Sequence, residues 1–216
     1  MAKRLFDLFF SSIGLIISSP LLLVVTLLIK LDSQGSVFFR QIRIGKNLTP
    51  FTIYKFRTMV DAPRQETVRL AAVQDYRITR LGRFLRKTKI DELPQLINVV
   101  IGQMSLVGPR PEVLKYVEKW PEDAKKQILS IKPGIADYAS FCYGNEEEVL
   151  AQEEDPESAY VNKVMPHKLR LYLRYLREQN LWLDLRIILA TLGKLAGINV
   201  AVLLPELKSE LSSPVK

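Results

Sequence analysis

The sequence predicts an α+β protein that is mostly helical, with a re-entrant membrane helix at its N-terminus and a small β-hairpin in the domain that follows. Three observations support this fold class. A charge-free apolar run extends from Leu8 to Ile29, one pair of alternating segments comes after it, and much of the remaining chain has the three- and four-residue spacing of apolar helix faces. We expect the membrane helix over residues 1–31 and a cytosolic domain with interfacial helices over residues 32–216.

The apolar run is long enough to span a bilayer, which needs about twenty apolar residues. Its centre, however, contains Ser19 and Pro20. Because proline removes a backbone donor and clashes with the preceding turn, and serine can bind the freed carbonyl groups, we expect a sharp kink there. Each arm is then about a dozen residues, or roughly 18 Å, which is too short to cross a hydrocarbon core of about 30 Å.

Basic residues lie on both sides of the apolar run: Lys3 and Arg4 before it, and Lys30, Arg40, Arg43 and Lys46 after it. Since basic residues mark the cytoplasmic side, both ends are predicted to be cytoplasmic. A proline-kinked spanning helix is the alternative that these residues leave open. A secretory signal peptide is disfavoured, because the run exceeds the usual length of about 7 to 15 residues and no small-x-small cleavage site follows it.

The composition limits the available chemistry. The 216 residues suffice for one domain of ordinary size, and a formal net charge of +8 favours an anionic partner such as nucleic acid, acidic lipid or a phosphorylated small molecule. The single cysteine, Cys142, cannot form an internal disulfide, and the single histidine, His167, cannot complete a zinc site with it. We expect Cys142 to be buried and His167 to lie at the surface or at a helix cap. Catalysis would then rest on carboxylates, basic side chains and a hard metal ion.

A β-hairpin is predicted directly after the membrane segment. Residues 36–43 and 51–59 are rich in β-branched and aromatic side chains and flank a Gly-Asn turn. Lys55 and Arg57 fall on one face of the second strand, where they either belong to a solvated edge or point at a phosphate. Residues 61–75 are polar and are expected to form a loop or a short helix.

A basic amphipathic helix is predicted beyond Arg77, because Leu81 and Leu85 mark an apolar face. Its cations suit a solvated face or a lipid-headgroup face. They are Arg80, Arg83, Arg86, Lys87 and Lys89.

The carboxylate pair Asp91-Glu92 lies between two arginine-bearing segments. Asp91 is expected to cap the next helix, whose first turn tolerates Pro94. Unpaired N–H groups and the helix dipole favour an ionised carboxylate or a bound phosphate at such a position, so Asp91 is predicted to be anionic and available as a nucleophile or metal ligand. Simple capping is the alternative. The Gly-Pro-Arg-Pro turn at 108–111 is expected to hold Arg110 in one position.

The C-terminal half gives fewer indications. Residues 146–157 are acidic and are expected to form a solvated loop or helix face. Residues 166–192 predict one or two helices, in which Trp182 packs in the core or, as an alternative, lies at a water–lipid boundary. From Pro205 onward we expect a polar tail.

Taken in order, several segments resemble those of the bacterial sugar transferase family, the monotopic phosphoglycosyl transferases. The resemblance covers roughly residues 1–135. Besides the Ser-Pro-interrupted apolar run, it rests on the motifs Arg4-Leu-Phe-Asp7, Lys55-Phe-Arg-Thr-Met59, Asp91-Glu-Leu-Pro-Gln-Leu-Ile-Asn98, Gly102-Gln-Met-Ser-Leu-Val-Gly-Pro-Arg-Pro111 and Lys132-Pro-Gly134.

This resemblance implies transfer of a sugar-1-phosphate from a UDP-sugar to polyprenyl (undecaprenyl) phosphate, with release of UMP, as the first membrane step of glycan assembly. It further implies Mg²⁺ as cofactor, the cytoplasmic leaflet of the bacterial inner membrane as location, and a covalent intermediate. Asp91 would be the nucleophile, with Glu92 beside it in the metal and proton chemistry. The residues implied to hold phosphate oxygens are Lys55, Arg86 and Arg110.

One departure leaves the donor sugar open. Many relatives continue after Pro-Gly with Ile-Thr-Gly and a Trp-Gln segment, whereas this chain reads Ile135-Ala-Asp-Tyr-Ala-Ser-Phe-Cys142. Two other functions compete. A membrane-anchored basic adaptor for anionic lipid or nucleic acid explains the charge but not Asp91-Glu92, because acidic groups weaken binding to a polyanion; we therefore expect no nucleic-acid partner. A glycosyltransferase that moves the sugar without its phosphate would release UDP.

Overall fold

The computed structural model describes residues 1–60, 77–143, 150 and 153–207. The chain starts with one long helix, α1 (Ala2–Asp32), followed by β1 (Phe38–Ile44), the short turn η1 (Lys46–Leu48) and β2 (Pro50–Phe56). The middle of the chain contains α2 (Arg80–Thr88), η3 (Ile90–Glu92), α3 (Gln95–Val100), β3 (Ser105–Val107), α4 (Leu114–Val117), α5 (Glu122–Ile128), β4 (Gly134–Ala136) and α6 (Ala139–Cys142). The C-terminal part contains α8 (Pro156–Ala159), η4 (Tyr160–Val164), α9 (Met165–Glu178), α10 (Leu181–Leu195), α11 (Val200–Leu203) and η5 (Pro205–Leu207).

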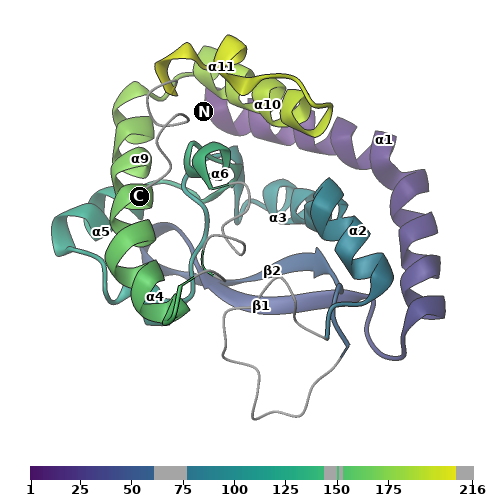
Figure 1. Cartoon of the computed structure of the whole chain (residues 1–216). Helices are drawn as coiled ribbons and strands as arrows, with labels where there is room; N and C mark the ends of the chain where they lie inside the picture. The colour runs from purple at the N-terminus through teal and green to yellow at the C-terminus, as the bar shows by residue number, and fades with distance from the viewer. Residues whose placement is uncertain (61–76, 144–149, 151–152, 208–216) are drawn as a thin grey trace.

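These elements confirm a mostly helical α+β fold with a small sheet component (Figure 1). The predicted hairpin is present: β1 and β2 pair antiparallel, from Phe38 opposite Phe56 to Ile44 opposite Pro50. The basic helix is α2, and the predicted C-terminal helices are α9 and α10. The predicted loop at 61–75, half of the acidic segment (146–149 and 151–152) and the end of the polar tail lie outside the described residues.

α1 differs from the expected pair of separate arms, because its backbone stays helical through Pro20. Proline lacks the N–H that would bind the carbonyl of Ile16, four residues earlier. The Ser19 hydroxyl donates to that carbonyl at 2.8 Å, and the Ser18 hydroxyl donates to the carbonyl of Gly14 at 2.6 Å. The serines therefore compensate for the proline without interrupting the helix, whose axis changes direction between its two halves (Figure 1).

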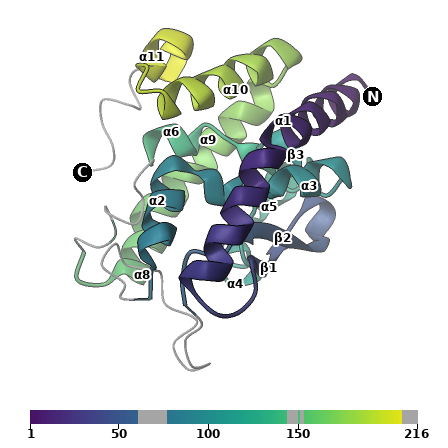
Figure 2. The same cartoon turned by 90° about the vertical axis from the view of Figure 1, so that its right-hand side faces the viewer.

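α1 leaves much of its apolar surface uncovered. Of the described helices, it is the one long and apolar enough to cross a membrane by length and composition. In Figure 2 it lies across the front of the domain, with β2 and α3 behind it. The large apolar side chains of α1 that remain exposed are Leu5, Leu8, Phe9, Phe10, Ile13, Ile16, Ile17, Leu21, Leu23, Val24, Leu27, Leu28 and Leu31.

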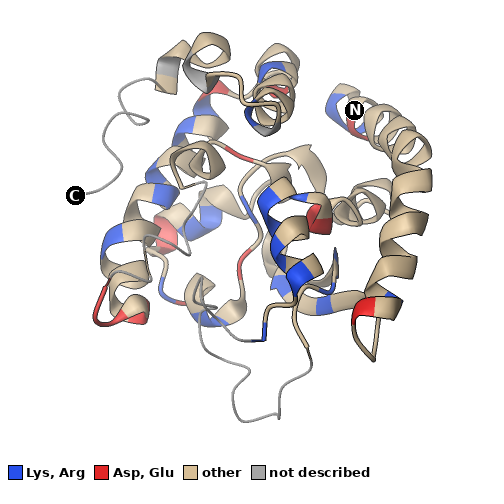
Figure 3. Ribbon diagram, turned by 45° about the vertical axis from the view of Figure 1, so that its right-hand side comes forward, with Lys and Arg blue, Asp and Glu red and all other residues tan. Residues whose placement is uncertain are grey.

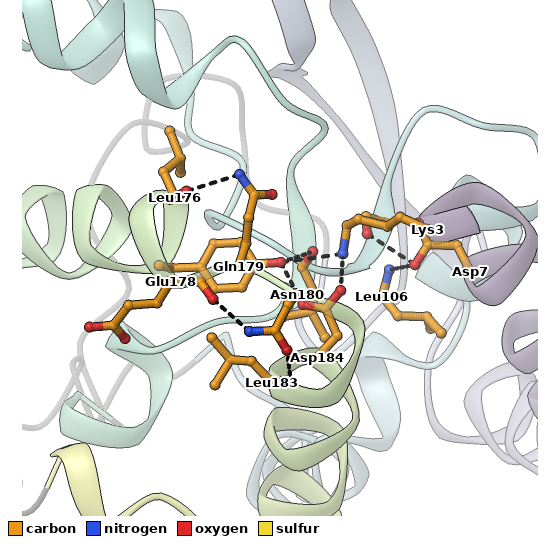
Figure 4. Close-up of polar contacts among 12 residues, drawn as sticks. Lys3, Asp7, Leu106, Leu176, Glu178, Gln179, Asn180, Leu183 and Asp184 are labelled. Atoms are coloured by element: carbon orange, nitrogen blue, oxygen red, sulfur yellow. Dashed lines mark hydrogen bonds and ion pairs between the residues drawn. The ribbon is translucent and has the colours of Figure 1, made fainter. Parts of the chain in front are cut away.

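A polar network fixes the start of α1 to the domain (Figure 4). The Lys3 ammonium lies 2.5 Å from Oδ2 of Asp184 on α10, and the Tyr175 hydroxyl donates to Oδ1 of the same carboxylate at 2.7 Å. The Asp7 carboxylate accepts the backbone N–H of Leu106 in β3 at 3.1 Å. Asp184 is 1% exposed, so this carboxylate depends on its partners for compensation of its charge.

A second contact connects the start of α1 to α3. The Arg4 guanidinium donates to the carbonyl oxygens of Val99 and Val100 at 2.6 and 2.8 Å. Carbonyl groups at the end of a helix lack intrahelical partners, and a cation there is favourable. At its other end, α1 is followed by Ser33 and Gln34, whose carbonyl oxygens accept hydrogen bonds from Arg57 at 2.7 and 2.8 Å.

Some single-residue predictions are wrong. His167 is 4% exposed, because its Nδ1 pairs with the Tyr143 hydroxyl at 2.6 Å inside the main core. Trp182 is 66% exposed, because α10 turns Leu183 and Ile187 toward the core and leaves Trp182 on the opposite face. Leu207 is fully buried, so the chain packs against the domain where a polar tail was expected to begin.

Two short parallel strands, β3 and β4, bring two backbone segments into close contact. In β3 and β4, Ser105 lies opposite Gly134, and Val107 lies opposite Ala136. A Cβ atom on Gly134 would lie 2.1 Å from the backbone nitrogen of Gly108. Since neither backbone can rotate away, this position requires glycine.

We predict that Gly134→Ala lowers the free energy of unfolding by at least about 1–3 kcal/mol, the usual cost of overpacking. The matched control is Gly193→Ala in α10, where a Cβ would meet only side-chain atoms, the nearest at 3.5 Å. Chemical denaturation of both variants in detergent measures the difference. Equal stability of the two variants would contradict the close approach of β3 and β4.

Candidate functional site

The carboxylate pair Asp91 and Glu92, called the dyad below, lies in a tight turn between two helices. Lys89 adopts a left-handed conformation with φ 57° at the end of α2, and η3 follows at once. The prediction that Asp91 caps the next helix is wrong, because η3 intervenes and α3 begins only at Gln95, with no side-chain cap. Both dyad residues are nearly buried, with 7% and 9% exposure for Asp91 and Glu92.

Glu92 is held by two cations. The Lys55 ammonium donates to Oε1 at 2.9 Å. The Arg110 guanidinium binds both carboxylate oxygens, with Nη1 at 3.2 Å from Oε2 and Nη2 on Oε1. Burial alone would raise the pKa of Glu92, but the charges and hydrogen bonds of Arg110 and Lys55 hold that pKa well below its usual range. Glu92 is therefore a fixed anion, and its ion pairs hold both cations beside Asp91.

The cations reach Glu92 from distant parts of the chain. Lys55 comes from β2, and Arg110 comes from the turn after β3. That turn is pinned at both sides, because the Gly108 N–H donates to the Ala136 carbonyl at 3.0 Å and the Gly134 N–H donates to the Pro109 carbonyl at 2.9 Å. The predicted turn before Arg110 is present, and its hydrogen bonds to Gly134 and Ala136 of β4 hold it.

Asp91 has a different environment from Glu92. Its Oδ1 is buried and has no hydrogen-bond partner among the described residues. Burial, and then the negative charge of Glu92, raises the pKa of Asp91 to about 6, against the opposing effects of Lys55, Lys89 and Arg86. At pH 7 such a group is still about nine-tenths ionised. A pKa of about 6 is compatible with the predicted anion at pH 7, but the site raises this pKa where a helix N-terminus would have lowered it.

Arg86 is the third predicted phosphate-binding residue. Its Nε donates to the Thr58 hydroxyl at 2.9 Å. Its positive charge acts on Asp91, so its side chain belongs to the same site. All five residues singled out from the sequence therefore lie together. In Figure 3 the blue basic residues of α2 lie next to the acidic turn that follows this helix.

Two other charged residues, Arg57 and Glu112, play different parts. Arg57 does not face a phosphate site, because its side chain is buried against the segment after α1 and donates to Ser33 and Gln34. Glu112, which follows the rigid turn, is occupied by Arg43 and by the Tyr160 hydroxyl. Both residues support the structure around the site.

Sequence reasoning did not single out Asp137. It follows β4 and is 2% exposed, and its charge raises the pKa of Arg110 after the larger effect of Glu92. The sequence did contain a signal, because the chain departs from the family pattern at residues 135–142. That departure was related to the choice of donor sugar and not to the Asp137 side chain.

The dyad fits Mg²⁺ in part. The unpartnered Oδ1 of Asp91 is an oxygen ligand of the kind that Mg²⁺ prefers, and this ion is usually held by one or two carboxylates together with substrate phosphates. Both oxygens of Glu92 already accept bonds from cations. The described part of the chain has no group of three or more His, Cys, Asp or Glu residues that could hold a metal by itself. Asp91 would therefore be the main protein ligand.

This arrangement suits nucleophilic chemistry on a phosphate. A carboxylate oxygen that is ionised, poorly solvated and not hydrogen-bonded is available for attack. Cations around a transferring phosphoryl group stabilise the negative charge on its oxygens, and here they come from three separate elements.

Comparison with known proteins identifies close relatives. A family model described as bacterial sugar transferase matches residues 1–197. The chain is 38% identical over 195 residues to UDP-glucose:undecaprenyl-phosphate glucose-1-phosphate transferase from Klebsiella pneumoniae, covering 89% of this chain and 39% of that protein. It is 36% identical over 192 residues to UDP-N-acetylgalactosamine-undecaprenyl-phosphate N-acetylgalactosaminephosphotransferase from Aeromonas hydrophila, covering 88% and 42%.

A shorter relative matches over most of its own length. The sugar transferase EpsL of Bacillus subtilis is 35% identical over 192 residues, which is 89% of this chain and 86% of that protein. By contrast, the chain spans only about two fifths of the length of the Klebsiella and Aeromonas relatives.

We predict that Asp91 of the metal-free protein titrates near pH 6. Glu92→Gln should move this titration to lower pH, because it removes the neighbouring negative charge and frees Lys55 and Arg110 to stabilise the Asp91 anion. Difference infrared spectroscopy of the carboxyl band measures both, with Asp91→Asn assigning the signal. An upward shift in Glu92→Gln would contradict the described electrostatics.

Proposed function

The chain belongs to the bacterial sugar transferase family, and from this premise we propose that it transfers a sugar-1-phosphate from a UDP-sugar to polyprenyl phosphate and releases UMP. The observation that carries the proposal is the asymmetry of the dyad: Glu92 is clamped by two cations, while Asp91 keeps a buried oxygen without a partner. The names of the relatives support both substrates.

The first step forms a covalent intermediate. A carboxylate oxygen of Asp91 attacks the phosphorus atom that carries the sugar. A new P–O bond forms to Asp91, the P–O bond to the uridylate phosphate breaks, and UMP leaves with the electron pair. In the second step, a phosphate oxygen of the polyprenyl acceptor attacks the same phosphorus. The acyl phosphate bond breaks, Asp91 is restored, and a polyprenyl diphosphate sugar is released.

The surrounding residues bind and orient the donor. Lys55 and Arg110 form ion pairs with Glu92, which hold both cations in position before the donor binds. Incoming phosphate oxygens can therefore bind these cations with little movement of either side chain. Arg86 acts from the side of Asp91. Mg²⁺, when bound at Asp91, would neutralise phosphate charge. A role for Glu92 in metal binding or proton transfer remains part of the proposal.

The same proposal places α1 in one leaflet of the membrane as a re-entrant helix, with both ends at the cytoplasmic surface. Both ends contact the same domain: Lys3 pairs with Asp184 at the start, and Arg57 binds Ser33 and Gln34 after the end. A helix that crossed the bilayer would separate its ends by about 30 Å of hydrocarbon, with the domain on only one side. A bend of α1 at Ser19 and Pro20 would then set the depth of insertion.

The outer face of α10 supports an interfacial role. It exposes Trp182 at 66% and Leu192 at 58%, and tryptophan is enriched where water meets lipid. A site at this level suits a lipid acceptor, because each CH₂ removed from the bilayer costs about 0.8 kcal/mol. The Klebsiella and Aeromonas relatives are named for two different sugars, so the donor here is a UDP-sugar whose sugar is left open.

We predict that a suitable UDP-sugar and Mg²⁺, without lipid acceptor, add the mass of a phosphosugar to the peptide that contains Asp91. Mass spectrometry of the digested protein locates the adduct, and a panel of UDP-sugars identifies the donor by UMP release. Asp91→Asn should abolish the adduct because the amide is a poor nucleophile. An unchanged adduct in that variant would refute the assigned nucleophile, and release of UDP would favour the competing glycosyltransferase.

A second prediction concerns topology. In a Cys142→Ser background, a cysteine introduced by Ala2→Cys should be labelled by a membrane-impermeant thiol reagent only after the cells are opened. Changing Ser19 to Ala and Pro20 to Leu together should straighten the helix and allow the N-terminus to reach the periplasm. Labelling of the Ala2→Cys protein in intact cells, with Ser19 and Pro20 unchanged, would rule out the re-entrant arrangement.

A further inference from the structure

The edge where β3 and β4 end brings a second carboxylate next to Arg110. The two strands are parallel and pair at Val107 and Ala136, so the residues that follow them emerge at the same edge. Arg110 follows one strand and Asp137 follows the other. Ligand-binding residues of parallel sheets gather at this edge, because the chain is free to turn there.

One carboxylate oxygen of Asp137 accepts a hydrogen bond, and the other has no partner among the described residues. Its Oδ1 accepts the backbone N–H of Ser140 at 2.9 Å, which supports the start of α6. Its Oδ2 is buried and has no hydrogen-bond partner among the described residues. A buried acceptor without a partner costs free energy, so a role in capping α6 does not account for the whole carboxylate.

The charges around Asp137 are positive. Burial raises the pKa of Asp137, and the positive charges of Arg110 and of Lys168, from α9, lower it. Asp137 in turn raises the pKa of Arg110. With 2% exposure, Asp137 is too buried to touch a substrate directly. Whatever it does to the reaction must pass through a neighbour that reaches the dyad, and Arg110 is that neighbour.

We propose that Asp137 is a positioning residue, which anchors Arg110 when the phosphate of the donor draws the guanidinium away from Glu92. This inference rests on the proposed function. A guanidinium has five N–H donors, and the two groups that bind Glu92 are the ones a phosphate would compete for. The nearby negative charge of Asp137 attracts the guanidinium independently of Glu92, so it keeps the cation in place as these donors change partner.

The test is Asp137→Asn, which keeps the shape and the acceptor for Ser140 but removes the charge. We expect kcat/KM for UMP release to fall about tenfold, the scale of a modest misplacement of a catalytic group. The matched control is Asp155→Asn. Asp155 also supports a helix start: it is the N-cap residue of α8 and accepts the N–H groups of Glu157 and Ser158. For this control, kcat/KM for UMP release should stay within about twofold of the value of the unmodified protein. The expected loss of about tenfold in Asp137→Asn is clearly larger than that.

A double-mutant cycle separates positioning from folding. In an Arg110→Lys background, Asp137→Asn should cause little further loss, because the group that it positions is gone. An equal loss in both backgrounds, or an Asp137→Asn protein as active as Asp155→Asn, would overturn the proposal. Should the Asn variant fail to fold, Asp137→Ser takes its place, since serine also accepts the N–H of a helix start and carries no charge.

A binding measurement makes the result independent of turnover. In the Asp91→Asn protein, which keeps Glu92 and Arg110, calorimetry with UDP as the probe should show several-fold weaker binding after Asp137→Asn. This difference should vanish when Arg110 is also changed to Lys. Absence of UMP release from every UDP-sugar would count against the proposed function, whereas unchanged UDP binding would count against the role of Asp137.

Discussion

The ion pairs of Glu92 are the interaction on which the site depends. Lys55 and Arg110 approach this carboxylate from a β-hairpin and from the turn after β3, and they hold its pKa far below normal. A carboxylate that is nearly buried needs such partners, and its partners gain fixed positions in return. Asp91, one residue away, receives no such bond on Oδ1 and has a pKa near 6. Two adjacent acidic residues thus acquire different hydrogen bonds and different pKa values through their neighbours.

The rest of the fold supports this arrangement. Gly108 and Gly134 let two backbones approach so closely that the turn carrying Arg110 has one position. Arg4 binds the carbonyl end of α3, which begins three residues after the dyad, so α1 and the dyad are mechanically connected. Because both ends of α1 contact the domain, the proposed membrane arrangement would let the shape of this one helix set the height of the dyad above the lipid.

Much of this could be predicted from local pattern. The hairpin, the basic helix and the turn each depend on residues close in sequence, whereas the set of five site residues was named with the help of the family resemblance. Other features depended on distant partners: His167 is buried because Tyr143 binds it, and Trp182 is exposed because α10 buries another face. The pKa of Asp91 rises because tertiary packing buries its carboxyl group. Sequence rules for helix starts do not include tertiary burial, so they predict the opposite shift. Ser19 restored the bond that Pro20 removed, so the expected break became a continuous helix.

The central claim is that Asp91 takes the phosphosugar onto itself before any lipid is present. The most direct measurement is isotope exchange: protein, UDP-sugar, Mg²⁺ and isotopically labelled UMP are mixed without polyprenyl phosphate. A covalent intermediate predicts that label enters the UDP-sugar, because the first step reverses with the labelled UMP. Label that enters only after the lipid acceptor is added, in a preparation that transfers sugar normally, would contradict the account.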